Sequence, residues 1–300
     1  MNSTNNSTLR ISKKDKIFDC INYGFACLFL VILIYPLYFI IIASVSDPSA
    51  VAGGRVWMWP VGFTMDGYKA LFDVDLIWIG YRNTILYTTV GTLIGLGINL
   101  PAAYALSRKD LVFRKFFTWM FIFVMFFSGG LIPTYLTIQS MGLLNNWIVL
   151  VLPFSVSIFH VIVARTFFLS SIPGDLWDAA SIDGCGNLRY FFTIVLPLSK
   201  AIIAVIALWT AVGHWNSYFN ALIYIRDETL QPLQLVLRRI LINNEQMIAH
   251  GTGEAAMLAM RRANIMRYAL IIVSTIPIMC FYPFIQKYFN QGVMIGAIKG

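Results

Sequence analysis

The sequence predicts an all-α membrane protein with six transmembrane helices, and two observations carry that prediction. Hydrophobic residues make up 58% of the 300 residues and charged residues only 12%, which is unlike an ordinary soluble domain. The apolar residues also gather in long continuous runs, whereas a membrane barrel would show short segments that alternate. Because backbone groups in lipid must bond within their own segment, these runs are expected to be helices.

Each predicted span is an apolar run near the length of about 20 residues that crosses a hydrocarbon core about 30 Å thick. The runs cover residues 20–45, 82–106, 116–132, 147–169, 201–225 and 268–285. The third is interrupted by Ser128-Gly129-Gly130, and the last contains Pro277 and Pro283. Glycine and proline weaken a helix, so the limits of these two runs are the least defined.

The basic residues give the expected orientation. With the N-terminus in the cytoplasm, most of the 22 Lys and Arg residues fall in cytoplasmic segments, as the positive-inside rule requires. The short loop 107–115 is the clearest indicator, because it holds Arg108, Lys109, Arg114 and Lys115. We expect a cytoplasmic tail over residues 1–16, a single transmembrane domain over 17–300, and both termini in the cytoplasm. The net charge of +8 follows from this rule and predicts no nucleic-acid partner.

Several classes of chemistry lack a signal. The four cysteines, Cys20, Cys27, Cys185 and Cys280, form no CxxC pair, and no His or Cys cluster has metal-ligand spacing, so we expect neither a disulfide nor a metal site. No HExxH sequence, carboxylate pair within a span or Ser/His/Asp set indicates catalysis. An ion-coupled secondary transporter stays open as an alternative, although the acidic residues lie almost wholly in loops.

The loop 170–200, between the fourth and fifth predicted spans, has the pattern of two short helices. Pro173 suits the first turn of a helix, and Gly184 supplies a left-handed stop. The first helix has one face made of Leu176, Ala179, Ala180 and Asp183, and the second has one made of Leu188, Phe191, Phe192 and Val195. Leu196-Pro197 is expected to end the second helix. Neither helix is long enough to be stable alone in water, so another surface must bury them.

The same loop carries the resemblance to a known family. Asp178-Ala179-Ala180, three residues, Gly184, nine residues, Ile194, one residue and Leu196-Pro197 resemble the Glu-Ala-Ala (EAA) motif of ATP-binding-cassette (ABC) importer permeases. Every fixed position matches except the first, where aspartate replaces glutamate. Segments 130–146, 215–227 and 282–300 also resemble the carbohydrate branch of that family, which includes maltose-type permeases for oligosaccharides and polysaccharides. We call residues 170–200 the coupling loop.

The resemblance implies a type I importer permease in a bacterial cytoplasmic membrane, where it forms half of the translocation pathway. The implied partners are a second, unlike permease, two ATPase subunits, an external solute-binding protein and a carbohydrate substrate. No Gly-x4-Gly-Lys-Ser/Thr sequence occurs, so ATP and Mg²⁺ are expected on the separate ATPase and no cofactor on this chain. An importer of a non-sugar solute is the nearest alternative.

The residues expected to couple the chain to the ATPase all lie in the motif and its two helices. They are Asp178, Ala179, Ala180, Asp183, Gly184, Leu188, Phe191, Phe192, Ile194, Leu196 and Pro197. By the resemblance, Leu188, Phe191 and Phe192 enter a groove on the ATPase. Asp178 is expected to accept a hydrogen bond from a basic residue there.

The fifth predicted span carries a polar and aromatic cluster that is a candidate for the substrate pathway. The candidates are His214, Trp215, Asn216, Tyr218 and Asn220. Polar side chains within a span usually face a cavity or another helix. The alternatives are an outer aromatic belt and amides bonded to neighbouring helices. We read Gly91 and Gly95 as a helix contact rather than a site.

The large outer loop 226–267 contains a further helical pattern. A single stripe joins Leu233, Val236, Leu237, Ile240 and Leu241. We expect this helix to pack on the membrane surface or on the partner permease, and it is also a candidate surface for the solute-binding protein.

Overall fold

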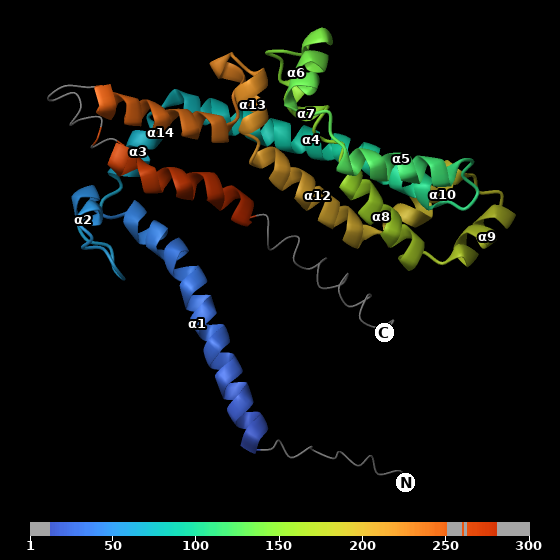
Figure 1. The fold of residues 1–300 in the computed structure, drawn as a ribbon, viewed down its shortest axis with the longest axis horizontal. Helices are drawn as coiled ribbons and strands as arrows, with labels where there is room; N and C mark the ends of the chain where they lie inside the picture. Colours follow the sequence, from blue (N-terminus) through green and yellow to red (C-terminus); the bar gives the residue numbers. More distant parts are fainter. Residues whose placement is uncertain (1–12, 251–259, 261–262, 281–300) are drawn as a thin grey trace.

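The computed structural model describes residues 13–250, 260 and 263–280, and this part of the chain consists of helices and loops without strands. The longest helix, α4 (Asp75–Ser107), is the axis of the fold, and α8 (Ile158–Ser171) and α12 (Lys200–Trp215) pack along it (Figure 1). The N-terminal helix α1 (Lys13–Ser44) extends away from this bundle, and only its last residues are buried. The all-helical prediction is therefore confirmed for the described residues.

The described residues contain three helices that are long and apolar enough to cross a membrane. These are α1, α4 and the helix Ala263–Cys280. Two bent pairs pass the same test when each is taken as one span: α5 (Arg114–Phe126) with α6 (Leu131–Ser140), at 111°, and residues 187–198 with α12, at 85°. Residues 281–285 of the last predicted span lie outside the described residues.

Two of the predicted runs are not continuous helices. In 147–169, α7 (Ile148–Val151) stops and α8 begins only at Ile158. Pro153 lies in the gap, and proline has no N–H for a helical hydrogen bond. In 201–225, α12 ends at Trp215 and α13 (Phe219–Tyr224) starts after a three-residue break. The predicted continuity was wrong in both, whereas the predicted interruption at 128–130 is confirmed by the gap between α5 and α6.

A buried asparagine on α4 holds the irregular backbone between α7 and α8. The Asn99 side chain donates to the Ser155 carbonyl at 3.0 Å and accepts from the Ser157 backbone N–H at 3.1 Å. Non-helical backbone at membrane depth needs such internal partners, because lipid offers none. Gly95, one turn earlier on α4, lets the break approach closely: a Cβ at this position would lie 2.9 Å from the Ser155 carbonyl oxygen.

The coupling loop forms two helical pieces that meet at Gly184. The first is α9 (Gly174–Ile182), and the predicted left-handed stop is confirmed, because Gly184 has φ +75°. The second runs through α10 (Asn187–Tyr190), a π-helical segment (Phe191–Val195) and α11 (Leu196–Leu198). We had predicted that Leu196-Pro197 ends the second helix. This prediction was wrong, because α11 includes both residues and continues to Leu198. The helix bends after Leu198, at the junction with α12.

The opposite end of α4 carries the short helix α3 (Asp66–Phe72) and α14 (Leu233–His250), and the short helix α2 (Pro48–Ala52) packs on the end of α1. The predicted stripe on α14 is confirmed, but its partner differs from the expectation. Its apolar residues pack against the start of α4 and the helix Ala263–Cys280, which belong to this chain. The Thr84 hydroxyl accepts from the Leu233 N–H at 2.8 Å, which fixes the start of α14 on α4.

The loop before α14 is fixed to α4 in the same way. A short 3-10 turn (Glu228–Leu230) leads into it, and the Asn83 amide donates to the carbonyls of Thr229 and Gln231 at 2.7 and 3.1 Å. Thr84 and Tyr104, which contact opposite ends of the fold, are 20 positions apart on α4. At 1.5 Å per residue this corresponds to about 30 Å along the helix axis, close to the thickness of a hydrocarbon core.

Candidate functional site

The first helix of the coupling loop turns a different face inward from the one we predicted. Trp177 and Ala180, one turn apart on α9, pack against the core of the bundle. Of the predicted face, only Ala180 is buried, whereas Leu176, Ala179 and Asp183 are exposed. Asp178 follows Trp177 in the sequence but is exposed, so its carboxylate remains accessible to another subunit. Trp177 is a residue that the sequence reasoning missed.

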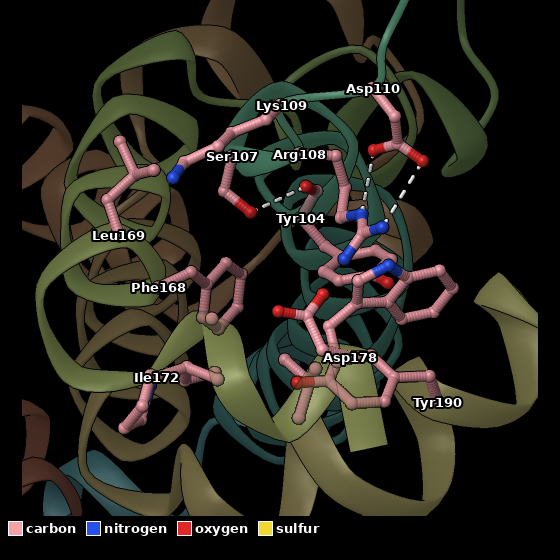
Figure 2. Close-up of a pocket in the computed structure, with 14 residues that line it drawn as sticks. Tyr104, Ser107, Arg108, Lys109, Asp110, Phe168, Leu169, Ile172, Asp178 and Tyr190 are labelled. Atoms are coloured by element: carbon pink, nitrogen blue, oxygen red, sulfur yellow. Dashed lines mark hydrogen bonds and ion pairs between the residues drawn. The ribbon is translucent and has the colours of Figure 1, made fainter. Parts of the chain in front are cut away.

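An arginine at the end of α4 holds Trp177. The Arg108 guanidinium lies over the indole ring, 3.7 Å from its centroid, and donates to both Asp110 carboxylate oxygens at 3.0 and 3.2 Å. These residues lie beside a cavity of about 360 Å³ between the end of α4, the end of α8 and α9, and Figure 2 shows the bonds from Arg108 to Asp110 at this cavity. Asp178 and Lys109 also line this cavity. The basic loop 107–115 and the motif helix are thus joined by one side chain.

The electrostatics of this contact act mainly on Asp110 and Tyr190. The hydrogen bonds from Arg108 hold the pKa of the exposed Asp110 carboxyl below its usual range. Burial raises the pKa of Tyr190, so its phenol is neutral at physiological pH. The Tyr190 ring meets the Trp177 ring edge to face, with centroids 5.1 Å apart. Aromatic packing and the cation–π contact of Arg108 with Trp177 therefore fix α9 on the bundle.

The second helix of the coupling loop divides the predicted apolar stripe in two. Phe191 and Val195 are buried in the core of this chain, and Phe191 packs on Tyr104 with ring centroids 5.0 Å apart. Our expectation that Phe191 enters the ATPase groove is therefore corrected, because its side chain is already 97% covered here. Ile194 and Leu196 are half-buried against the same core, and Pro197 is exposed.

Three large apolar side chains of the coupling loop are more than 60% exposed. Ile182 is 86% exposed, Leu188 76% and Phe192 62%. Leu188 and Phe192 are four positions apart and share a helical face. We call Ile182, Leu188 and Phe192 the apolar edge. Exposed apolar groups of this size, on a loop that also leaves the Asp178 carboxylate accessible, are typical of a surface that another protein covers.

The candidate pathway residues separate into two groups. His214 and Trp215 are buried and have partners within the bundle: His214 Nε2 lies 3.1 Å from Ser155 Oγ, and Trp215 Nε1 donates to the Ser274 carbonyl at 3.0 Å. Gly91 makes room for the imidazole, because a Cβ there would lie 2.3 Å from His214 Nε2. This confirms that Gly91 is a helix contact. The same geometry places the His214 and Trp215 side chains in contacts between helices of this chain.

The other candidates lie at the break between α12 and α13. Asn216 and Tyr218 are exposed and Asn220 is half-buried. Within the described part of the chain, none of these three side chains has a hydrogen-bond partner. The structure therefore brings Asn216, Tyr218 and Asn220 to a surface and separates them from His214 and Trp215.

Metal chemistry finds no support in the described ranges, since residues 13–250, 260 and 263–280 hold no group of three or more His, Cys, Asp or Glu side chains placed to bind one ion.

Comparison with known proteins assigns the chain to a family. Residues 77–295 match the family described as the binding-protein-dependent transport system inner membrane component. The polygalacturonan/rhamnogalacturonan transport system permease protein YtcP of Bacillus subtilis (strain 168) is 37% identical over 291 residues, which is 96% of this chain and 100% of that protein. Protein LplC of the same organism is 36% identical and covers 98% of both chains.

A solved structure gives the same result. A chain from a bacterial ABC transporter involved in the import of the acidic polysaccharide alginate matches with a TM-score of 0.83. It is 32% identical and covers 93% of this chain and 98% of that one. The chain belongs to the family of inner membrane components of binding-protein-dependent transport systems, with the fold of an ABC importer permease. It is a transporter permease subunit.

Proposed function

We propose that this chain forms half of the translocation pathway of a carbohydrate importer and couples it to a cytoplasmic ATPase through the coupling loop. The observation that carries the proposal is the exposure of the apolar edge and of Asp178 on one loop, which Arg108 and Phe191 attach to the rest of the chain. This arrangement offers one face to a partner and fixes the other to the membrane helices.

The contact with the ATPase uses the two kinds of group that the coupling loop leaves free. Burial of the Leu188 and Phe192 side chains contributes roughly 1.5–3 kcal/mol each. A hydrogen bond from a basic residue of the ATPase to Asp178 contributes roughly 1.5–3 kcal/mol. ATP and Mg²⁺ bind the ATPase, because this sequence has no phosphate-loop motif.

The motion passes into the membrane by two routes. α9 moves the end of α4 through the Arg108–Trp177 contact, and the second helix moves the bundle through Phe191 and Val195, which lie in its core. Because packed interiors transmit displacement with little compression, ATP-driven movement of the coupling loop shifts the helices as units.

The proposed topology has six spans with both termini in the cytoplasm. The spans are α1, α4, α5 with α6, α7 with α8, α12 with α13, and the helix Ala263–Cys280. The long α4 supports this assignment, since the basic loop 107–115 directly follows its C-terminal end. The coupling loop is then cytoplasmic, and α3 and α14 are external.

The proposed assembly has a second, unlike permease, two ATPase subunits and an external solute-binding protein. The proposed substrate is an oligosaccharide that contains uronic acids. Support comes from the two similar proteins whose named substrates are galacturonan polymers and alginate. The more distant melibiose/raffinose/stachyose permease MelC of Bacillus subtilis (strain 168), at 26% identity, keeps a neutral sugar as the second candidate.

Reconstitution of the whole assembly in liposomes tests this function. We expect uptake of a labelled oligosaccharide only with ATP, the ATPase and the loaded solute-binding protein. Uptake driven by a proton or sodium gradient without ATP would contradict the proposal and favour an ion-coupled transporter.

A further inference from the structure

The break between α12 and α13 places free polar groups beside an arginine of α14. Asn216 and Tyr218 have no side-chain hydrogen bond within the described residues, and Tyr218 is 40% exposed. The Arg238 guanidinium lies over the Tyr218 ring, 4.9 Å from its centroid. Residues from two separate elements therefore form one surface, with an aromatic ring and a cation, and the exposed Asn216 lies two positions before the ring.

The charge of Arg238 is available to a ligand. Its neighbour Arg239 is bound to Glu228, with 2.5 Å between guanidinium nitrogen and carboxylate oxygen. Arg238 is exposed and has no acidic partner among the residues that the structure describes. Stacking on Tyr218 restricts the guanidinium while its N–H groups stay free to donate.

The surface lies at the end of the fold away from the coupling loop. α14 packs on α4 near Thr84, whereas the coupling loop packs near Tyr104. Figure 1 shows α14 and α9 at opposite ends of the bundle. In the proposed topology Tyr218 and Arg238 are therefore at the external mouth of the membrane helices, where a substrate enters.

We propose that Tyr218 and Arg238, with Asn216, form a recognition site for a uronic acid residue of the carried glycan. The face of the phenol ring opposite the guanidinium takes the apolar face of the sugar ring, and the guanidinium binds the carboxylate with two parallel hydrogen bonds. The Asn216 amide forms hydrogen bonds with sugar hydroxyl groups. This inference rests on the proposed function and adds to it a residue that distinguishes acidic from neutral glycans.

The test compares Arg238→Gln with Arg239→Gln in the reconstituted transporter. The probes are trigalacturonate and its carboxyl-reduced, neutral analogue, and the readout is the maximal rate of ATP-dependent uptake at saturating solute-binding protein. We expect Arg238→Gln to lower the rate for trigalacturonate about tenfold and to leave the rate for the neutral analogue within about twofold. Arg239→Gln should change neither by more than about twofold.

Further readouts separate this site from other roles of Arg238. Arg238→Lys keeps the charge without the planar fork and should give an intermediate rate for trigalacturonate, which provides a folded variant if Arg238→Gln is unstable. An increase in the concentration of solute-binding protein needed for half-maximal ATPase stimulation, with an unchanged maximal rate, would overturn the inference in favour of a docking role.

The comparison of acidic with neutral oligosaccharides distinguishes an error in the recognition site from an error in the proposed function. Equal losses for both probes would overturn the recognition site. ATP-dependent uptake of neutral oligosaccharides, but not of trigalacturonate, by the wild-type assembly would also overturn it and leave the carbohydrate importer intact. Absence of uptake of any oligosaccharide would instead contradict the proposed function itself.

Discussion

At the scale of single residues, Gly184 has a conformational role that the neighbouring Gly186 lacks. Gly184 has φ +75°, in the left-handed region, and Gly186 has φ −76°, which any residue adopts. A Cβ at either position would meet nothing within 4 Å. The two glycines therefore differ in backbone conformation and not in available space.

We predict that Gly184→Ala uncouples the transporter and Gly186→Ala does not. The left-handed conformation costs an L-residue about 1–2 kcal/mol, so α9 and α10 should lose their relative orientation in the Gly184→Ala protein. The measurement is the number of solutes carried per ATP hydrolysed in liposomes. Equal ratios for the two variants would show that the turn at Gly184 is not needed for coupling.

Arg108 is the second residue with a specific role, because it joins α4 to the motif helix. We predict that Arg108→Gln weakens this contact by about 1–2 kcal/mol, the range of a partly desolvated cation–π contact. Thermal unfolding in detergent should occur at a lower temperature and uptake per ATP should fall. Lys115→Gln, an exposed position in the same basic loop, is the matched control and should behave as wild type. Unchanged coupling in Arg108→Gln would refute the transmission route through Trp177.

At the scale of elements, α4 depends on close approach by α12 and by the break before α8. Gly91 faces the His214 imidazole, and Asn99 bonds to Ser155 and Ser157 within the break. Gly97, on the same helix, has open space where a Cβ would be. These contacts make one face of α4 intolerant of side chains and leave another permissive.

We predict that Gly91→Ala destabilises the protein and Gly97→Ala does not. Glycine to alanine inside a helix normally adds up to about 1 kcal/mol of stability, which Gly97→Ala should show. In Gly91→Ala the new methyl group collides with His214, so the unfolding temperature and the amount of folded protein should fall. His214→Ala in the same chain should partly restore both. An unfolding temperature for Gly91→Ala at or above that of wild type would contradict this packing.

The elements also show how far the sequence could predict the structure. Apolar runs and Gly184 identified most helices and the turn of the motif, because these signals are local. The break between α7 and α8 is held by Asn99 from a distant helix, and this contact has no local signature. Within the π-helical segment, Phe191 is buried and Phe192 is exposed. The apolar pattern at helical spacing placed both residues on one face and could not predict this difference. Trp177 was missed because its partner, Arg108, lies far away in the sequence.

At the scale of the whole molecule, the two proposed functional surfaces lie at opposite ends of α4. One end carries the coupling loop with its apolar edge, and the other carries Tyr218, Arg238 and the elements packed on Thr84. The packed bundle between the two ends can transmit a displacement from one end to the other, because packed helices move as units. The account depends on the coupling loop being cytoplasmic and in contact with the ATPase.

Cysteine cross-linking tests that dependence most directly. In a chain whose four cysteines are replaced by serine, Leu188→Cys is expected to form a short-linker adduct with the ATPase subunit in inside-out vesicles. Phe63→Cys, equally exposed but in the proposed external loop, should form none. The opposite result, with no adduct from Leu188→Cys or with its labelling by a membrane-impermeant thiol reagent from outside intact cells, would contradict the account.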